Sequence, residues 1–156
     1  SGFNLRPTDI QGAIAHNQFK RLNKLKQQRN QNRNTIISYL KSSKLWKNQM
    51  KFIEFNQSTK PSWFGLPIII NDNYVNQKKK YINYLESNGI ETRPIISGNF
   101  TNQPSVKLFN LNPNKIKFPN ADEIEKKGFF IGLHTTKIKK TELDYLSSKL
   151  LKLGNF

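Results

Sequence analysis

Residues 8–40 have the sequence TDIQGAIAHNQFKRLNKLKQQRNQNRNTIISYL, and this stretch decides how the rest of the chain can fold. Thr8 follows a proline and lies three residues before Gln11, which is the pattern of a capping box at a helix N-terminus. Apolar residues then recur at helical spacing and form one stripe: Ile10, Ile14, Leu22, Leu25, Ile36 and Leu40. We therefore expect one helix that is roughly 50 Å long at ~1.5 Å per residue.

The middle of this expected helix carries no apolar side chain between Gln27 and Asn34. Such a segment is either exposed to solvent on every side or packed against something outside this chain, and the sequence leaves both explanations open. His16 lies beside the apolar stripe, where a surface or packing histidine is the ordinary interpretation.

Beyond this helix, segments with the apolar pattern of strands alternate with segments that have the pattern of helices. The expected strands are residues 51–55, 62–70, 90–96 and 129–133. The expected helices are residues 76–88, which Gly89 would end, a single turn at 106–109, one capped by Asn120, and one from a Thr141 cap to about Leu153. The chain is therefore predicted to be α/β (α+β), with a long linking helix in residues 1–42 and a small domain in residues 43–156. That domain would have a small mixed or antiparallel sheet with helices on one face.

The composition excludes several classes of protein. The 156 residues contain no cysteine, so neither a disulfide framework nor a cysteine-based zinc site can form. Two histidines and 10 acidic residues leave little material for a metal site, and none is expected. No apolar run approaches the ~20 residues that a membrane helix needs, so no membrane partner is expected.

The formal charge of +16 raises the question of nucleic-acid binding, because a basic domain can neutralise phosphates. However, 21 of the 26 basic residues are lysine, and 20 asparagines accompany them. Arginine is the better reader of phosphates and bases because its guanidinium is planar. The charge therefore fits the residue bias of an AT-rich genome, and a basic nucleic-acid-binding module is kept only as a second alternative.

The residues alone form few catalytic patterns, since the chain has no G-x-G-x-x-G, P-loop, G-x-S-x-G or H-E-x-x-H motif. Two segments could bind an anion. Residues 2–9 place Arg6 just before a helix N-terminus, and residues 92–104 place Arg93 before a loop rich in glycine and asparagine. A simple helix cap and an ordinary polar loop explain the same residues equally well. His134 follows an expected strand, and strand ends often border ligand sites.

At these segments the chain resembles the DegT/DnrJ/StrS-type family of sugar aminotransferases, which use pyridoxal or pyridoxamine phosphate. Residues 2–14, GFNLRPTDIQGAI, are similar to the family pattern G-[YF]-N-x-[RK]-x-[ST]-[DE]-[ILM]-Q-A-A-[IV]. Within the family, the nucleotide-linked 4-keto-6-deoxyhexose 3-dehydratases have patterns similar to four further segments: PSWFGLPI at 61–68, IETRP at 90–94, GNFTNQP at 98–104 and GFFIG at 128–132. The resemblance covers nearly all of the chain.

The resemblance implies the C-terminal small domain of a fold type I pyridoxal-phosphate enzyme, together with its linking helix. In this family a large domain precedes this region and carries the cofactor pocket. It also carries the residue that faces the cofactor, which is lysine in the aminotransferases and histidine in the 3-dehydratases. The resemblance therefore implies no catalytic residue within these 156 residues. By itself, such a chain is expected to be inactive and to bind no cofactor.

The resemblance also assigns roles to particular residues. Asn4 would reach the cofactor phosphate of the neighbouring subunit in a homodimer. Arg93, Asn99 and Phe100 would border the nucleotide-linked sugar. His134 is a further candidate contact to the substrate from its place after an expected strand, not from the resemblance. The implied function is that of a CDP- or GDP-4-keto-6-deoxyhexose 3-dehydratase in dideoxysugar and lipopolysaccharide O-antigen biosynthesis, acting in the cytoplasm. A nucleotide-sugar aminotransferase is the first alternative.

Overall fold

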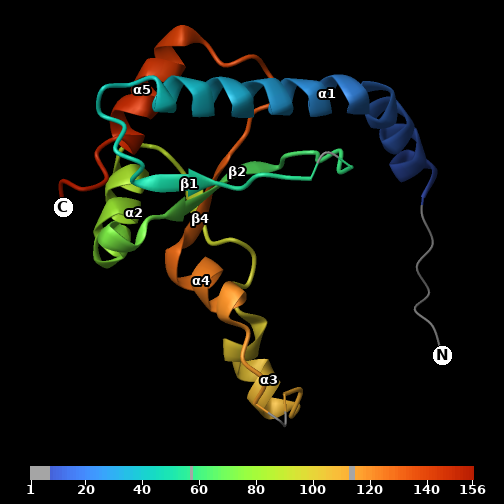
Figure 1. The fold of residues 1–156 in the computed structure, drawn as a ribbon. Coiled ribbons are helices and arrows are strands. Elements are labelled where there is room, and N and C mark those ends of the chain that lie inside the picture. Colours follow the sequence, from blue (N-terminus) through green and yellow to red (C-terminus); the bar gives the residue numbers. More distant parts are fainter. Residues whose placement is uncertain (1–7, 57, 113–114) are drawn as a thin grey trace.

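The computed structural model describes residues 8–56, 58–112 and 115–156. A long helix is followed by short strands and helices in alternation (Figure 1). The α-helices are α1 (Asp9–Lys41), α2 (Lys78–Ser87), α3 (Pro104–Leu108), α4 (Pro119–Lys127) and α5 (Lys140–Leu150). The strands are β1 (Met50–Phe52), β2 (Gly65–Ile70), β3 (Thr92–Arg93) and β4 (Gly128–Gly132). Two 3-10 helices, η1 (Asp72–Gln77) and η2 (Phe100–Asn102), complete the order.

The four strands form one antiparallel sheet in the order β1-β2-β4-β3. The central pair runs from Gly65 opposite Gly132 to Ile69 opposite Gly128. β3 adds only two pairs at the edge, and in one of them Arg93 lies opposite Phe130. The predicted class, a long helix followed by a small sheet with helices on one face, is confirmed.

The core lies between this sheet and helices α1, α2 and α5. Alternate residues of the central strands point into the core because side chains alternate along a strand. The buried core includes Leu66 and Ile68 of β2, Phe129 and Ile131 of β4, Leu40 of α1, Leu85 of α2, and Leu143 and Leu150 of α5. Tyr81 is fully buried beside Phe129, and its hydroxyl donates to the Leu150 carbonyl at 2.8 Å. This burial raises the pKa of Tyr81.

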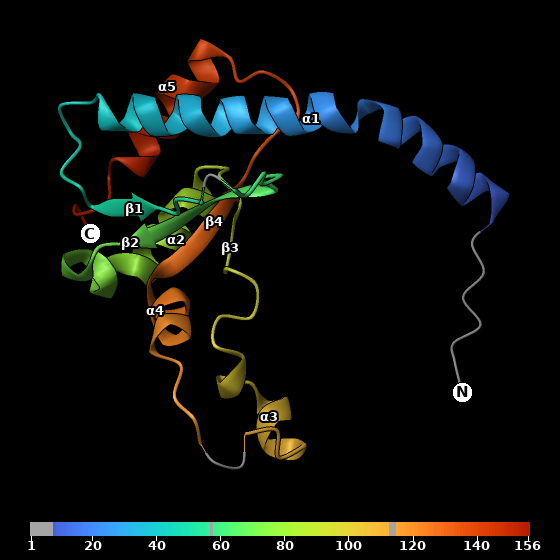
Figure 2. The ribbon, with the colours of Figure 1, turned by 45° about the vertical axis from the view of Figure 1, so that its right-hand side comes forward.

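The strands are shorter than the sequence pattern predicts. The expected strand at 90–96 is reduced to Thr92–Arg93, because Pro94 has no N–H to donate to the ladder. Ile96 then takes a positive φ of 48°, which turns the chain away from the sheet. Residues 95–112 and 115–118 form an arm on the opposite side of the sheet from α1, with α3 near its tip (Figure 2).

Helix ends follow local chemistry, although two predicted caps were wrong. Pro119, not a cap at Asn120, begins α4, because the first helical position does not need an N–H. At α5 the N-cap is Lys139, whose N–H donates to the Glu142 carboxylate at 2.8 Å. Gly89 ends α2 as predicted, with φ at +73°.

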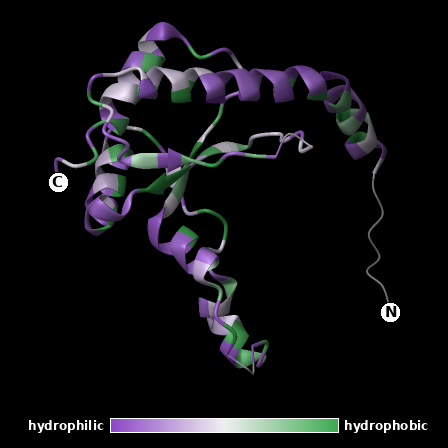
Figure 3. Ribbon diagram, viewed as in Figure 1, coloured by the Kyte–Doolittle hydropathy of each residue, from purple (hydrophilic) through white to green (hydrophobic). Residues whose placement is uncertain are grey.

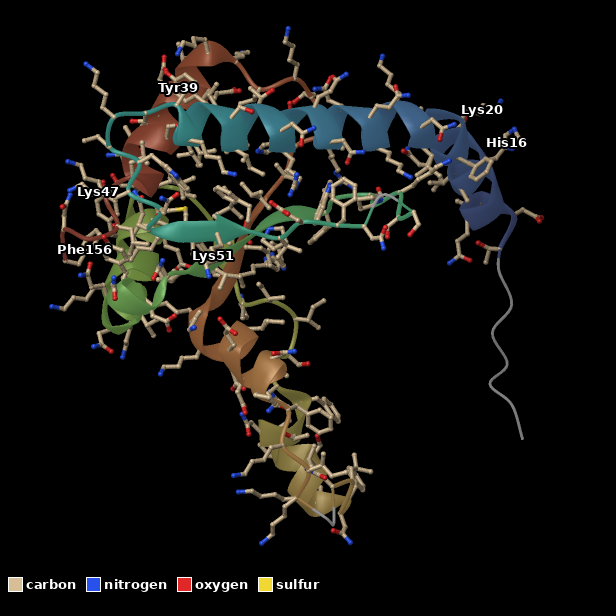
Figure 4. The ribbon with its side chains drawn as sticks, viewed as in Figure 1. His16, Lys20, Tyr39, Lys47, Lys51 and Phe156 are labelled. Carbon is tan, nitrogen blue, oxygen red and sulfur yellow. The ribbon has the colours of Figure 1, made fainter. Side chains whose placement is uncertain are left out.

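The capping box at the start of α1 is also confirmed. The Gln11 N–H donates to Thr8 Oγ1 at 3.3 Å, and the Thr8 N–H donates to Gln11 Oε1 at 2.9 Å. The N-terminal half of α1 extends beyond the sheet, and His16 and Lys20 lie on this projecting part (Figure 4). Four of its apolar side chains are exposed: Ile10, Ile14, Phe19 and Leu22.

The polar middle of α1 corrects the sequence interpretation of residues 27–34. This segment packs against other parts of the same chain, and Asn32 and Arg33 are 3% and 7% exposed. The Arg33 guanidinium donates to the Ile53 carbonyl at 2.6 Å and lies 4.5 Å from the centre of the Trp63 ring. Periodicity missed this contact because it is made by polar side chains.

Candidate functional site

The loop after β3 is held against α4 by side-chain hydrogen bonds. Asn99 is 3% exposed, and its Oδ1 accepts from the backbone N–H and the hydroxyl of Thr101 at 3.0 and 2.7 Å. Its Nδ2 donates to Asp122 at 2.6 Å. The Glu125 carboxylate accepts from the Asn99 N–H and from Asn102 Nδ2 at 3.1 and 2.8 Å. Both polar atoms of the Asn99 side chain are thus used inside the protein, so Asn99 shapes the loop.

This loop presents Phe100 to solvent. Gly98 has φ at +61°, and a Cβ there would lie 2.8 Å from the Glu125 side chain. Only glycine therefore fits between the turn and α4. Phe100, two residues later, is 53% exposed. Of the predicted pair, Phe100 is the side chain available to a ligand, and Asn99 holds it in position.

Arg93 lies on the edge strand β3, with its side chain 62% exposed. Its Nε and one terminal nitrogen donate to Glu91 at 2.9 and 2.7 Å. Because both partners are exposed, this ion pair contributes little to stability. An incoming phosphate could replace Glu91 at small cost, since a guanidinium binds phosphate and carboxylate with the same fork of donors.

His134 follows β4 and lines a cleft of about 890 Å³ between α1, α5 and the turn after α2. The floor of this cleft is apolar and includes Ile36, Leu133 and Leu146. Asn32 fixes the backbone beneath His134, because its Nδ2 donates to the His134 carbonyl at 3.0 Å. The His134 imidazole itself is exposed.

The structure brings together only part of the predicted set. Glu125, which anchors Asn99, lies just before β4, whereas His134 lies just beyond its other end. Arg93 lies opposite Phe130 near the middle of this strand. Asn99 and His134 are therefore at opposite ends of a strand that is roughly 17 Å long at ~3.4 Å per residue.

Several residues that shape the site carried no functional signal in the sequence. Asp122 and Glu125 resembled ordinary helix-start acids, although their spacing of three residues places both on one helix face. Lys78 of α2 fixes the same helix by donating to the Glu125 carbonyl at 2.9 Å, and burial lowers its pKa. Asn4, the predicted cofactor ligand, lies outside the described residues.

Comparison with known proteins places this geometry in context. The model of the DegT/DnrJ/EryC1/StrS aminotransferase family matches residues 1–150. The chain belongs to this family. It shares 32% identity over 151 residues with the GDP-4-keto-6-deoxy-D-mannose 3-dehydratase of Escherichia coli O55:H7. The matched region covers 96% of this chain and 37% of that protein. For the Yersinia pseudotuberculosis protein of the same name, identity is 33% over 134 residues, or 85% of this chain and 32% of that protein.

Two solved structures superpose on this chain along almost its whole length. The E. coli 3-dehydratase with bound hydrated PLP superposes with a TM-score of 0.79 at 31% identity, covering 96% of this chain and 36% of that chain. Helicobacter pylori PseC, an aminotransferase of pseudaminic acid biosynthesis, gives 0.81 at 20% identity over 99% of this chain and 40% of its own, which shows the fold alone. This chain thus spans about a third of the length of the curated relatives it matches.

Two absences hold for the described part of the chain. Within it, no helix is both long enough and apolar enough to cross a membrane. Residues 8–56, 58–112 and 115–156 also bring together no group of three metal-ligating side chains.

Proposed function

We propose that this chain is the C-terminal part of a nucleotide-sugar 3-dehydratase that acts with pyridoxal or pyridoxamine phosphate on a GDP- or CDP-linked 4-keto-6-deoxyhexose. The observation that carries this proposal is the match to 3-dehydratases along almost the whole chain. Identity to the E. coli O55:H7 protein is 32% over 96% of the chain. A Salmonella typhimurium lipopolysaccharide biosynthesis protein, RfbH, is 30% identical over 95% of it.

Within that enzyme, this chain would bind and orient the sugar nucleotide. Arg93 would pair with a phosphate oxygen in place of Glu91, and Phe100 would cover the sugar from the loop that Asn99 holds. His134 would contact a different part of the substrate, because it lies at the other end of β4. The cofactor, when bound, supplies the electron sink for loss of the hydroxyl next to the ketone.

The cofactor and a second subunit would be held by the remainder of the protein and by the segment before α1. We propose that Asn4 binds the cofactor phosphate of the neighbouring subunit in a homodimer. This role is supported by the family match, which begins at residue 1 and so includes Asn4. We also propose that the enzyme acts in the cytoplasm and contributes to O-antigen synthesis.

A nucleotide-sugar aminotransferase is the second candidate. It is favoured by the fold shared with PseC, at a TM-score of 0.81. Identity to such structures is lower, however, at 20% for PseC and 14% for the sugar aminotransferase CalS13. The 3-dehydratase therefore remains the better-supported function.

The test is to identify the product that the proposed longer protein forms. That protein is purified with its upstream part and supplied with PLP, glutamate and GDP-4-keto-6-deoxymannose. A 3-dehydratase releases a sugar that has lost the 3-hydroxyl, whereas an aminotransferase releases one with an amino group at the former ketone. Mass spectrometry of the product separates the two. An aminated product would overturn the 3-dehydratase assignment, and failure to bind PLP would overturn both.

A further inference from the structure

The sequence contains one asparagine–glycine pair, Asn88–Gly89, although asparagine occurs 20 times. The pair ends α2, with Asn88 as the C-cap residue and Gly89 at a φ of +73°. Because glycine has no side chain, its backbone nitrogen can approach the side-chain carbonyl carbon of the preceding residue closely. Asn88 is therefore the asparagine of this chain that is chemically most open to deamidation.

Deamidation of this pair consumes only water. The Gly89 nitrogen gives up its proton and bonds to Cγ of Asn88, while the bond from Cγ to the side-chain nitrogen breaks and ammonia leaves. Water then adds to one of the two carbonyl carbons of the cyclic imide and opens it. The product is aspartate, or isoaspartate, in which the main chain runs through Cβ and Cγ. Because ammonia is lost, the change is irreversible.

The folded end of α2 holds both reacting groups in hydrogen bonds. The Gly89 N–H donates to the Glu86 carbonyl at 2.9 Å. Nδ2 of Asn88 donates to the Tyr84 carbonyl at 2.8 Å. Both hydrogen bonds must be lost on the way to the imide, because the Gly89 nitrogen loses its proton and the Asn88 side-chain nitrogen departs.

Two further hydrogen bonds hold the turn that follows. The Ile90 N–H donates to the Leu85 carbonyl at 3.0 Å, which completes a helix terminus of the kind that glycine favours. The Tyr145 hydroxyl of α5 donates to the Asn88 carbonyl at 2.8 Å. The Asn88–Gly89 peptide is thereby tied to both α2 and α5, so it rearranges only when this helix end opens.

We propose that Asn88 is a deamidation site that reacts only when the C-terminal end of α2 opens, and whose product keeps that end from closing again. An aspartate at this position has no N–H to donate to the Tyr84 carbonyl, and it places a negative charge at the negative end of the helix dipole. An isoaspartate lengthens the main chain before Gly89, so the N–H groups of Gly89 and Ile90 no longer meet their carbonyls. The site thus converts an opening of α2 into a permanent change.

The change also alters the cleft that His134 lines. Gly89, Ile90 and Tyr145 belong to the lining of the same cleft. The turn after α2 is therefore one wall of the cleft, and loss of its native hydrogen bonds reshapes that wall.

The first experiment compares the rate of Asn88 deamidation in the folded 156-residue chain and in the same chain unfolded in guanidinium chloride, both at mildly alkaline pH. Peptide mass spectrometry after digestion in acid measures the conversion of amide to acid. The folded chain is expected to react at least about tenfold more slowly, because only its opened fraction reacts. Equal rates, or no reaction at Asn88 in the unfolded chain, would overturn the proposal.

Matched variants test the contact with α5. Tyr145→Phe removes the hydroxyl that holds the Asn88 carbonyl, and it is expected to speed deamidation of the folded chain about fivefold, the effect of one lost hydrogen bond. Tyr39→Phe is the control, since its hydroxyl bonds to Asp144 of α5 and not to the turn after α2. Equal rates in the two variants would contradict control of the reaction by opening of this helix end.

The effect of the product is tested with Asn88→Asp. Hydrogen exchange of the Ile90 amide should accelerate about tenfold, because the end of α2 stays open for longer. Asn83→Asp, which adds the same charge at an exposed position of α2, is the control and should leave this exchange unchanged. Native protection of the Ile90 amide in Asn88→Asp would overturn the claim that the product keeps the helix end open.

Discussion

The two halves of α1 share one apolar stripe, but its side chains are buried in the C-terminal half and exposed in the N-terminal half. In the C-terminal half, Ile36 and Leu40 are 3% and 0% exposed and pack into the core. In the N-terminal half, Ile10 and Ile14 are 73% and 59% exposed. Figure 3 shows hydrophobic residues (green) at the N-terminal end of α1, beyond the sheet. A mainly hydrophilic segment (purple) separates them from the C-terminal end of the helix.

This difference shows how much structural information the helical periodicity of a sequence carries. Periodicity identifies the face that a helix will bury but does not say which partner buries it. The polar segment between the halves is where docking actually begins, through the buried side chains of Asn32 and Arg33. The exposed half has the composition of an interface, and under the proposed function the remainder of the longer protein would cover it.

The largest expected effect contrasts one apolar residue from each half. Leu40→Ala should lower the free energy of unfolding of this chain by about 3 kcal/mol, because it leaves a cavity in the core. Ile14→Ala should change it by less than about 0.5 kcal/mol, because the side chain is already exposed. Urea denaturation of both variants measures the contrast. Similar losses in the two would show that the N-terminal half is packed in solution.

The next effect concerns the polar segment. Asn32→Ala should lower the free energy of unfolding by about 2 kcal/mol, because the carbonyls of His134 and Thr136 and the N–H of Ile138 lose their hydrogen-bond partner. Asn17→Ala, on the exposed half, is the control. Amide hydrogen exchange at Ile138 should accelerate in the Asn32 variant alone, and unchanged exchange would contradict the role of this side chain.

A smaller effect is expected at Arg33. Arg33→Met should lower stability by only about 1 kcal/mol, because the lost hydrogen bond and cation–π contact are offset by removal of a buried charge. Burial already lowers the pKa of Arg33. Iodide quenching of tryptophan fluorescence should increase as Trp63 becomes accessible. Arg21→Met is the exposed control, and equal quenching in both variants would argue against the stacking.

The smallest expected effect is a pH dependence of stability where α5 contacts the C-terminal half of α1. Hydrogen bonds from Lys140 and Tyr39 lower the pKa of Asp144 below its ordinary value of 3.8. A carboxyl group with a lowered folded-state pKa stabilises the protein above its unfolded pKa, and this stabilisation is lost as pH falls through the folded pKa. The midpoint temperature of thermal unfolding should therefore be lower for the Asp144→Asn variant than for the unaltered chain at pH 6. The two midpoints should converge in strong acid, near pH 2. A constant difference across this range would refute the assignment.

Much of the fold was predictable because local chemistry specifies it. The Thr8 capping box, the Gly89 helix end and the continuous apolar, β-branched run of β2 each depend on residues close in sequence. The short β3 and the start of α4 were mispredicted because two prolines, Pro94 and Pro119, outweighed the surrounding pattern.

The candidate site was less predictable, because its geometry depends on contacts between distant segments. The loop motif indicated both Asn99 and Phe100, but only the structure separates the buried residue from the exposed one. The carboxylates that hold Asn99 come from 23 and 26 residues away. No spacing rule links them. His134 and Arg93 are likewise placed by strand register rather than by any local motif.

The most direct test of the central claim compares PLP binding by this chain alone and by the longer protein that includes the upstream part. Absorbance spectroscopy after removal of free cofactor measures both. The proposal predicts stoichiometric PLP on the longer protein and none on the 156-residue chain. Stoichiometric PLP on the 156-residue chain by itself would contradict its assignment as the small domain of a divided cofactor site.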